Sequence, residues 1–432
     1  MLVQIAIVLL IITLVLGIPV PFAFFASTIF LVITAGYDPS FLLPYGYSKM
    51  STSVLLAIPL FILAGGFMAK GKIGGKLIDL VEVFVGRIKG GLGVVAVVSC
   101  AVFGSITGSA AATLSVIGSL MFPRLEKAGY PKGHSAALIA NAAVLGMLIP
   151  PSSIMILYAW IGNQSVLASF LASVIPGIIL VVLISLVNIW LLRNNKDIVI
   201  NEKMDFSTRT RLLGKRTVSA GPALVMPVMV LGGIYSGMFT PTEAAALAAL
   251  YAIPVGFFIY KGLNRKNFIE SIIESAVTTG VIMVMLYSVM ILSRLYITED
   301  LTGVLAGFLT AISEDKYIIL LMMNIFMIVM GMIMDDVSAV LLCTPILLPI
   351  AIQIGISPVH FAAVVGVNLG MGNITPPTAP LLYLSSRLGN APLRNMFTPT
   401  FYLLAFAWLP TLLITTYLPA LSMWLPQLVL GK

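Results

Sequence analysis

Long uninterrupted runs of apolar residues dominate this chain, and polar residues are confined to short stretches between them. Residues 2–16, 167–192 and 353–369 would carry apolar side chains on every face of a helix. A membrane-spanning helix needs about 20 such residues, whereas the strands of a membrane β-barrel alternate apolar and polar positions. The pattern therefore predicts an all-α polytopic membrane protein.

The residues that interrupt these apolar runs recur in a second copy. Identical residues follow 226 positions after Pro123, His134, Gly146 and Pro150-Pro151, and 227 positions after Gly104 and Asn141. Glycine and proline break helices, so the duplicated positions are those where a membrane helix would be interrupted. Two such halves predict inverted repeats and a transporter that holds its substrate where the halves meet.

Composition and charge support a membrane location. Hydrophobic residues make up 59% of the chain and charged residues 9%, whereas a soluble domain is about a quarter charged. Of the 24 Lys and Arg residues, 20 fall in five groups, at residues 70–89, 124–132, 193–216, 261–266 and 387–394. The positive-inside rule places all five groups on the cytoplasmic side if the N-terminus lies outside. The net charge of +8 is then explained by topology, and no nucleic-acid partner is expected.

This charge distribution predicts the domain organisation. We expect a first inverted repeat at residues 1–192, a cytoplasmic linker at 193–216 and a second repeat at 217–432. Each repeat would have about five transmembrane helices and one re-entrant helical hairpin, so the chain would cross ten times and end outside. The hairpins are expected at about 91–127 and 316–353, and the broken helices at about 133–162 and 360–386.

Each predicted hairpin carries a polar tip inside an apolar stretch. Residues 103–113 form a run rich in glycine, alanine, serine and threonine, and residues 331–338 contain the adjacent carboxylates Asp335 and Asp336. Small residues alone could serve close helix packing. Paired carboxylates in a membrane are costly, however, and usually bind something. The two tips therefore predict an ion site.

A Pro-Pro pair breaks a membrane helix downstream of each hairpin, at Pro150-Pro151 and Pro376-Pro377. Consecutive prolines remove two amide donors, leaving free carbonyls before the break and a new helix N-terminus after it. Free carbonyls suit a hard cation, and a helix N-terminus suits a carboxylate. The alternative is a pair of simple proline kinks, but their duplication in register with the hairpins favours a site.

Other charged or titratable residues have competing explanations. Arg294 follows an uncharged run and either extends to the outer surface or pairs with a substrate carboxylate. Glu243 and Thr240 form a predicted capping box, so Glu243 more plausibly starts a helix than carries a proton. His134 and His360 lie too far apart in the topology to form a metal pair. No combination of nucleophile, base and acid indicates an enzyme.

Several motifs together resemble the large membrane subunit of tripartite ATP-independent periplasmic (TRAP) transporters. They lie at residues 59–65, 103–113, 150–151, 237–246 and 344–349. The resemblance implies a sodium-driven, elevator-type importer of an organic acid anion in a bacterial inner membrane. In such a membrane the charge distribution above predicts that both termini are periplasmic. The resemblance also implies two partners, a small four-helix membrane subunit and a periplasmic substrate-binding protein. The Na+ ions, two or more, would be transported rather than structural.

The resemblance also assigns residues to sites. One sodium ion would lie among Ser105, Ser109, Asn141, Gly146 and Ile149, and a second among Gly331, Asp335, Asp336, Gly370, Gly372 and Thr375. The substrate would contact Ser109, Arg294, Asp336 and Thr378. The Asp335-Asp336 pair and the polar segment 373–380 depart from many dicarboxylate-type members and look more like a sialic acid system.

Alternatives from other classes remain open. One is a stand-alone Na+/carboxylate carrier of the ion transporter superfamily, with a C4-dicarboxylate as substrate. Another is an ion channel, although two inverted broken helices favour a closed, alternating site. The sequence also leaves proton coupling open, while serine and carbonyl ligands suit sodium better.

Overall fold

The computed structural model describes residues 2–85, 88–198 and 206–431, and within these ranges it contains helices and no β-strand. The prediction of an all-α fold is therefore confirmed. Apolar surroundings favour helices because every backbone amide and carbonyl can be paired within the segment.

Within the described residues, the first half contains thirteen helical elements up to residue 192. They are α1 (Leu2–Val15), α2 (Val20–Ala35), η1 (Pro39–Phe41), α3 (Leu42–Met50), η2 (Ser53–Leu56), α4 (Ala57–Lys70), α5 (Ile73–Val85), α6 (Gly91–Thr107), α7 (Ala110–Lys127), α8 (Lys132–Ala143), α9 (Leu145–Leu148), α10 (Ser153–Ile161) and α11 (Val166–Leu192).

The described part of the second half, residues 206–431, contains another thirteen. They are α12 (Phe206–Tyr235), α13 (Pro241–Pro254), η3 (Val255–Ile259), α14 (Arg265–Thr298), α15 (Leu301–Ile312), α16 (Lys316–Ile333), α17 (Asp336–Gln353), α18 (Pro358–Gly372), α19 (Pro380–Leu388), α20 (Leu393–Leu403), η4 (Leu404–Trp408), α21 (Leu409–Tyr417) and α22 (Pro419–Leu430). The elements η3 and η4 are π-helical turns.

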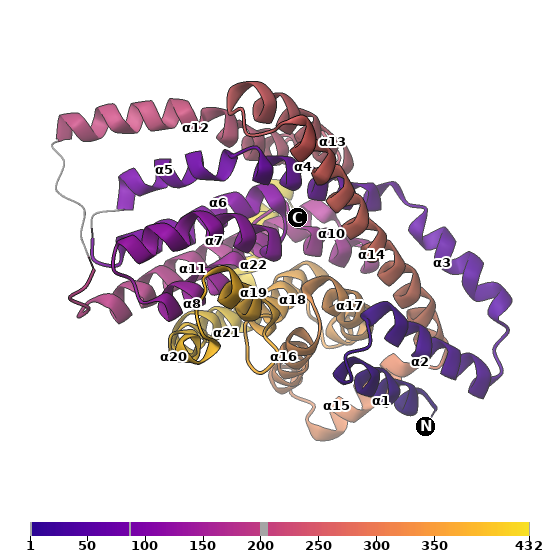
Figure 1. The fold of residues 1–432 in the computed structure, drawn as a ribbon. Coiled ribbons are helices and arrows are strands. Elements are labelled where there is room, and N and C mark those ends of the chain that lie inside the picture. Colours follow the sequence, from indigo (N-terminus) through magenta and orange to yellow (C-terminus); the bar gives the residue numbers. More distant parts are fainter. Residues whose placement is uncertain (1, 86–87, 199–205, 432) are drawn as a thin grey trace.

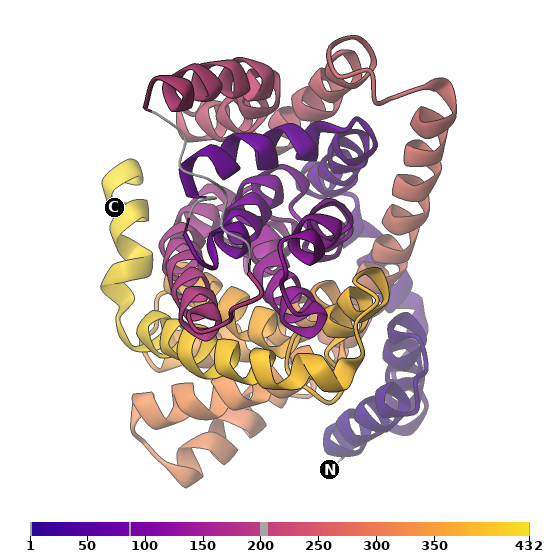
Figure 2. The same ribbon diagram turned by 60° about the vertical axis from the view of Figure 1, so that its left-hand side comes forward.

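The helices form two groups, which we call the peripheral helices (α1–α5 and α12–α15) and the central body (α6–α11 and α16–α22) (Figure 1). Among the peripheral helices, α4 packs against α13 and α14, and α14 also packs against α2 and α3. In Figure 2 the long helix α14 runs along one side of the central body. Each half of the chain thus contributes to both groups.

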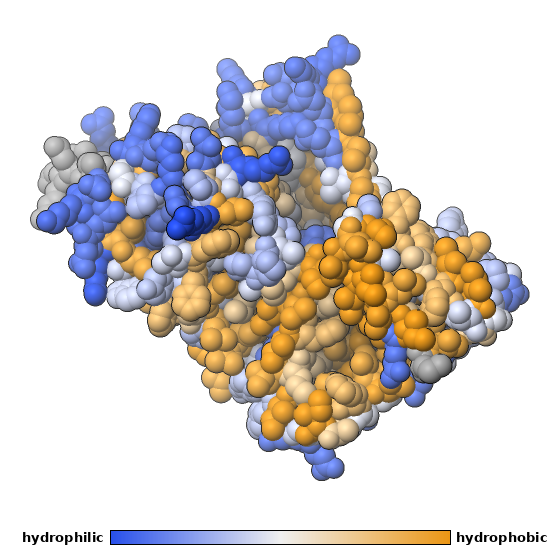
Figure 3. Space-filling view, turned by 60° about the horizontal axis from the view of Figure 1, so that its bottom comes forward, coloured by the Kyte–Doolittle hydropathy of each residue, from blue (hydrophilic) through white to orange (hydrophobic). Residues whose placement is uncertain are grey.

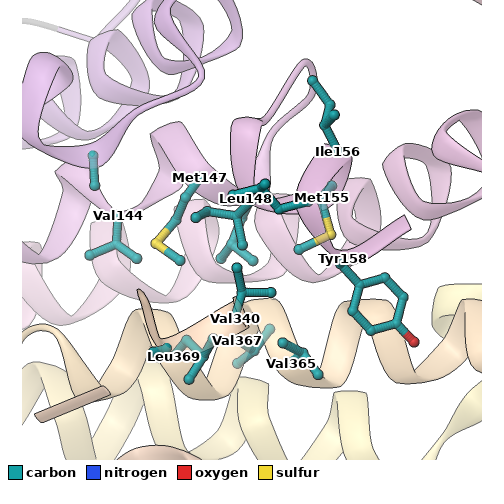
Figure 4. Packing of buried hydrophobic residues seen from close by; sticks show 14 of the residues in the cluster. Val144, Met147, Leu148, Met155, Ile156, Tyr158, Val340, Val365, Val367 and Leu369 are labelled. Atoms are coloured by element: carbon teal, nitrogen blue, oxygen red, sulfur yellow. The ribbon is translucent and has the colours of Figure 1, made fainter. Parts of the chain in front are cut away.

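The central body is held together by contacts between the two halves of the chain. Helix α10 packs against α17, and both α9 and α11 pack against α18. Figure 4 shows this core, where Met147, Leu148 and Met155 of the first half face Val340, Val365, Val367 and Leu369 of the second. The contact is close because Gly366 has no side chain, and a Cβ there would lie 2.7 Å from the Met155 Cε atom. The two broken helices therefore share one apolar core.

The surface shows where lipid would contact the protein. Hydrophobic side chains cover a broad band of the face in Figure 3, and hydrophilic side chains gather beyond it at the ends. Within the described chain, eight helices are long and apolar enough to cross a membrane, or nine if the bent pair α8–α10 counts as one. Two of the eight are α16 and α17, the arms of the predicted second hairpin. The protein is thus a multi-pass membrane protein, while the ten-crossing topology stays a prediction.

The helix α12 extends further than the sequence indicated. It begins at Phe206, inside the segment 193–216 that was expected to be a linker. Contacts with α5 explain this difference, because Arg216 donates to the Asp79 carbonyl at 2.5 Å and lies 3.6 Å from the Glu82 carboxylate. Arg124 of α7 pairs with the Asp79 carboxylate at 2.9 Å. This network joins α5, α7 and α12, so the basic run is partly structural.

The predicted capping box at the start of α13 is present. The Thr240 hydroxyl accepts a hydrogen bond from the Glu243 amide at 3.3 Å, and the Glu243 carboxylate accepts one from the Thr240 amide at 2.8 Å. Both interactions pair backbone amides that the first helical turn would otherwise leave free.

We therefore expect Glu243→Ala to lower the thermal midpoint of the purified protein in detergent by a few degrees. Glu243→Gln should melt like the wild type, since glutamine also completes a capping box. Differential scanning fluorimetry of the three proteins measures this. If the thermal midpoint fell equally in both variants, the negative charge of Glu243 would be the cause, and not the capping box.

Candidate functional site

The first hairpin turns at a glycine that is forced into the left-handed region. Helix α6 ends at Thr107, Gly108 has φ +62°, and Ser109 caps α7 by accepting from the Ala112 amide at 3.5 Å. A Cβ on Gly108 would also lie 2.9 Å from the carbonyl oxygen of Pro151. A side chain is therefore excluded here twice, by backbone conformation and by space.

The second hairpin turns at the two carboxylates. Asp335 caps α17 by accepting from the Ser338 amide at 3.4 Å and from the Ser338 hydroxyl, and Asp336 is the first helical residue. Asp335 is exposed, whereas Asp336 is half-buried. The two tips thus have the same plan, a helix N-terminus capped by a polar side chain at the turn.

The first broken helix opens at its Pro-Pro pair. Ile149 is extended, and the axes of residues 132–148 and 153–161 differ by 45°. Ser152 reconnects the break, since its hydroxyl donates to the Met147 carbonyl at 2.6 Å and accepts from the Met155 amide at 3.5 Å. The break is an ordered structure that presents the N-terminus of α10.

The second break spans residues 373–379, between α18 and α19. The Thr375 hydroxyl donates to the Met371 carbonyl at 2.6 Å, and the Thr378 hydroxyl donates to the Met332 carbonyl of the hairpin α16–α17. Both Pro-Pro peptide bonds, Pro150-Pro151 and Pro376-Pro377, are cis. Each break therefore lies against the hairpin of its own half.

Glycines on facing helices allow this approach in both halves. A Cβ on Gly104 would lie 2.4 Å from the Gly146 Cα atom, and a Cβ on Gly372 would lie 2.7 Å from the backbone of Gly331. These four residues are two of the repeated pairs, Gly104 with Gly331 and Gly146 with Gly372. The same backbone contact thus recurs between hairpin and broken helix.

A cavity of about 610 Å³ lies between the hairpin tips and the peripheral helices α4 and α14. Three helix N-termini reach it, through Ser109 of α7, Ser153 of α10 and Asp335 of α17. Its remaining polar lining consists of Thr107, Ser115, Ser275, Thr278, Glu274 and Asp336. All its lining residues are described, and none is Lys or Arg. Positive potential in this cavity therefore comes from helix ends.

The site residues expected from the sequence fall into several sets. Ser109, Asp335 and Asp336 line the cavity. Four others, Gly146, Gly331, Gly372 and Thr378, lie at the contacts between hairpins and breaks. The Ser105 and Thr375 hydroxyls bond within their own segments, to the Val102 and Met371 carbonyls. Gly370 instead faces the other half, since a Cβ there would lie 2.7 Å from Val144 Cγ1. Ile149 faces α11, since a Cβ built on Gly177 would lie 3.0 Å from the Ile149 Cγ1 atom.

Arg294 lies outside the cavity. Its side chain is exposed, and its guanidinium carbon is 5.4 Å from the centre of the Tyr45 ring. A cation over an aromatic face is a favourable contact at a membrane surface. The structure thus places this arginine of α14 against Tyr45 of α3, in agreement with the snorkelling explanation and away from the helix N-termini that meet at the tips.

Two buried asparagines have an unpaired side-chain oxygen. Asn141 and Asn368 are both fully buried, and each donates through its amide nitrogen to a carbonyl four residues earlier. Neither Oδ1 atom has a hydrogen-bond partner in the described structure. Asn324 accepts from the Asn368 amide at 2.9 Å. Buried oxygens of this kind normally have a partner, so they are available to a ligand.

Sequence reasoning assigned Asn141 a role but missed Asn368, although the repeat offset joins the two. It also missed Glu274, Ser275 and Thr278, which present a polar stripe of α14 to the cavity. Their helical spacing within an otherwise apolar segment was the available signal.

The fold and this duplicated site define a polytopic transport protein of the permease type. The chain belongs to the family described as tripartite ATP-independent periplasmic transporter, DctM component, whose family description matches residues 5–421. This confirms the resemblance drawn from the motifs. The family is described as a transporter component, and the relatives below are named as permeases.

Three relatives illustrate the range of substrates. The isethionate TRAP transporter permease DctMQ of Oleidesulfovibrio alaskensis is 33% identical over 95% of this chain, which spans only 64% of that longer relative. The C4-dicarboxylate large permease DctM of Pseudomonas aeruginosa is 36% identical over 86% of both chains. The sialic acid large permease SiaM of Vibrio cholerae is 31% identical over 96% of both.

A solved structure supports the fold. The Alcanivorax borkumensis YdaH transporter, described as having an unusual topology, matches 87% of this chain and 85% of its own with a TM-score of 0.58 at 16% identity. At this identity the likeness concerns the fold alone.

The glycine contacts generate a stability prediction. Gly104→Ala should destabilise the protein by about 1–3 kcal/mol, because the new methyl group would collide with backbone. Gly75→Ala is the matched control, since no atom lies within 4 Å of a Cβ built there. Thermal melting in detergent compares them. A Gly104→Ala protein as stable as the control would contradict the close approach.

Proposed function

We propose that this protein is the large membrane subunit of a sodium-coupled importer of an organic acid anion in a bacterial inner membrane. A periplasmic binding protein would deliver the anion, and a small four-helix membrane subunit would complete the permease. Membership of the TRAP family supports the partners. The observation that supports the coupling to sodium is the cavity, which is lined by two hairpin tips and three helix N-termini.

The charges in the cavity require a cation. Three carboxylates line it, and although Glu274 pairs with Lys70 at 2.9 Å, Asp335 and Asp336 have no basic residue beside them in the lining. An anion about 4 Å from one of them would be repelled by about 4 kcal/mol at an effective dielectric constant of about 20. This corresponds to roughly a thousandfold loss of affinity. Sodium bound at the tips would remove the repulsion, so the anion would bind after the cation.

Two sodium sites fit the polar groups at the tips. The first would use Ser105, Ser109, the Asn141 side-chain oxygen and the carbonyls of residues 146–149. The second would use Asp335 or Asp336, Thr375, the carbonyls near Gly331 and Gly372, and the Asn368 side-chain oxygen. The two unpaired amide oxygens support these assignments, because sodium is a hard cation that prefers oxygen ligands.

The cavity favours a hydroxylated acid with one carboxylate. Six hydroxyl side chains line it, from Thr107, Ser109, Ser115, Ser153, Ser275 and Thr278. They can pair with the hydroxyl groups of a sugar acid such as sialic acid, whose carboxylate would face the helix N-termini. A C4-dicarboxylate is the second candidate, supported by the relative with 36% identity. Its second carboxylate would lack a fixed positive partner.

The structure suggests an inward-facing state in this mechanism. The cavity extends past Glu274, which is 67% exposed and lies 2.9 Å from Lys70 Nζ. Lys70 begins one of the basic groups predicted to be cytoplasmic. The cavity lies between the central body and the peripheral helices α4 and α14, so sliding of one group against the other would carry the site across. Only a ligand that binds the two states differently can drive this movement.

Asp336→Ala should abolish sodium-dependent uptake while the subunits still assemble. The assay uses liposomes that contain both membrane subunits, the binding protein outside, labelled sialic acid and an inward sodium gradient. Asp38→Asn and Arg294→Gln are the controls, because both side chains are exposed and outside the cavity, and we expect wild-type uptake from both.

Each result of this assay bears on one part of the proposal. Unchanged uptake by Asp336→Ala would remove the carboxylate from the mechanism. A raised KM in Arg294→Gln would return Arg294 to the substrate site. Competition by succinate but not by unlabelled sialic acid would favour the C4-dicarboxylate. Uptake without the binding protein would support a stand-alone carrier.

Asn368→Ala should raise the sodium concentration for half-maximal uptake about tenfold, equivalent to about 1.4 kcal/mol. It removes a proposed ligand oxygen but leaves the cavity lining unchanged. Asn188→Ala is the matched control, since Asn188 is equally buried but pairs with His134 at 2.9 Å and with the Gly90 carbonyl at 2.8 Å. Sodium titrations compare the variants, and an unchanged requirement in Asn368→Ala would exclude this ligand.

A further inference from the structure

A groove runs along the outside of the central body, between α11 and the segment formed by α20 and η4. Two adjoining pockets make it up. The first, of about 400 Å³, is lined by Leu191 and Leu192 of α11, by Asn195 just after that helix, by Asn395, Thr398, Pro399 and Tyr402 of α20, and by residues 131–134. The second, of about 260 Å³, is lined by Leu183, Leu186, Val187 and Trp190 of α11 and by Phe406 of η4. Tyr402 of the first pocket and Trp190 of the second are in ring contact, so the two pockets adjoin.

The first pocket is the more polar of the two, and cationic residues lie in its lining and beside the border between the pockets. Lys132, Asn195, Asn395 and Thr398 supply polar side chains to it. Arg193 follows directly after α11, and its guanidinium carbon lies 5.9 Å from the centre of the Trp190 ring. Lys89 donates to the Arg193 carbonyl at 3.4 Å, which brings a third cation to the same end. Glu126 is the acid in contact, at 2.9 Å from Lys132 Nζ.

The second pocket is apolar and partly open to the surroundings. Trp190, Phe406 and Leu186 are 44%, 52% and 55% exposed. The Trp190 ring meets Tyr402 at 5.6 Å and Phe406 at 5.8 Å between ring centres, in edge-on arrangements. An aromatic cluster at the border between a polar and an apolar surface is typical of the membrane interface. The groove thus has a charged end and an apolar end, which match the charged headgroup and the apolar acyl chains of a phospholipid.

We propose that this groove binds one anionic phospholipid of the cytoplasmic leaflet. Its phosphate would lie among Lys132, Arg193 and the amide side chains of Asn195 and Asn395, and an acyl chain would lie along Trp190 and Phe406. The position agrees with topology, because the basic groups at residues 124–132, 193–216 and 387–394 are all predicted to be cytoplasmic, where anionic lipids are enriched. A protein helix is about 10–12 Å wide, too wide for the 260 Å³ apolar pocket.

The bound lipid would join parts of the central body. Helix α20 packs against α8, the first arm of the broken helix, and α11 packs against α18 of the other half. A lipid between α11 and α20 therefore contacts elements that position both breaks. This site is separate from the cavity at the hairpin tips and does not depend on the proposed cargo.

Native mass spectrometry of the purified full-length chain tests the site. The protein is mixed with phosphatidylglycerol and phosphatidylcholine of identical acyl chains at equal concentration. We expect the complex with one bound phosphatidylglycerol to be at least ten times as abundant as the complex with one bound phosphatidylcholine. The double variant Lys132→Gln with Arg193→Gln should lose this preference, and Arg387→Gln, an exposed cation of the same predicted face outside the pocket, should keep it.

A second pair of variants tests the apolar end. Trp190→Ala should weaken retention of both lipids, whereas Trp424→Ala, 57% exposed on α22, should not. If Trp190→Ala does not fold, the tryptophan fluorescence of the wild-type protein is measured instead. We expect brominated phosphatidylglycerol to quench this fluorescence more strongly than brominated phosphatidylcholine does. Equal retention of the two lipids by the wild type, or an unchanged preference in the double variant, would overturn the proposal.

Discussion

The close contact of glycine backbones between each hairpin and its broken helix is the constraint on which this structure depends. Gly104 against Gly146, and Gly331 against Gly372, leave no room even for a methyl group. The contact brings each Pro-Pro break to the turn of a hairpin, where carbonyls and amides lack partners in their own helices. An apolar environment cannot satisfy such groups. Packing at four residues without side chains therefore creates the polar site.

Only some of the polar groups at this site have hydrogen-bond partners, and the groups without a partner indicate which ligands the site can hold. Serine and threonine hydroxyls cap helices or bond to nearby carbonyls, as Ser152 and Thr375 do. The Asn141 and Asn368 oxygens and the two tip carboxylates have more accepting capacity than the described donors use. Three helix N-termini add positive potential in the same space. An arrangement rich in both acceptors and helix N-termini suits a cation and an anion together, and neither alone.

Repeated glycines and prolines made the hairpins and breaks predictable, because helix interruption is a local property of these residues. The capping box at Thr240 was predictable for the same reason. The position of a side chain relative to a helix distant in the sequence was harder to predict. The sequence could not show that Arg294 stacks on Tyr45, since the partner lies on a distant helix. It also indicated a linker where α12 already begins, because contacts with α5 stabilise a helix that its polar composition does not suggest. Side-chain position depended on tertiary packing, and helix position largely did not.

Shared packing between the halves has a consequence for coupling in the proposed mechanism. Met155 and Leu148 of the first half contact the second half at Gly366, so both breaks rest on one apolar core. Interiors packed at crystal-like density transmit small displacements. Sodium binding that orders one tip would therefore restrict the other before the anion arrives. A cavity with separate cores behind each tip would fill its two sites independently. Each ion would then remove only part of the repulsion between the substrate anion and the tip carboxylates.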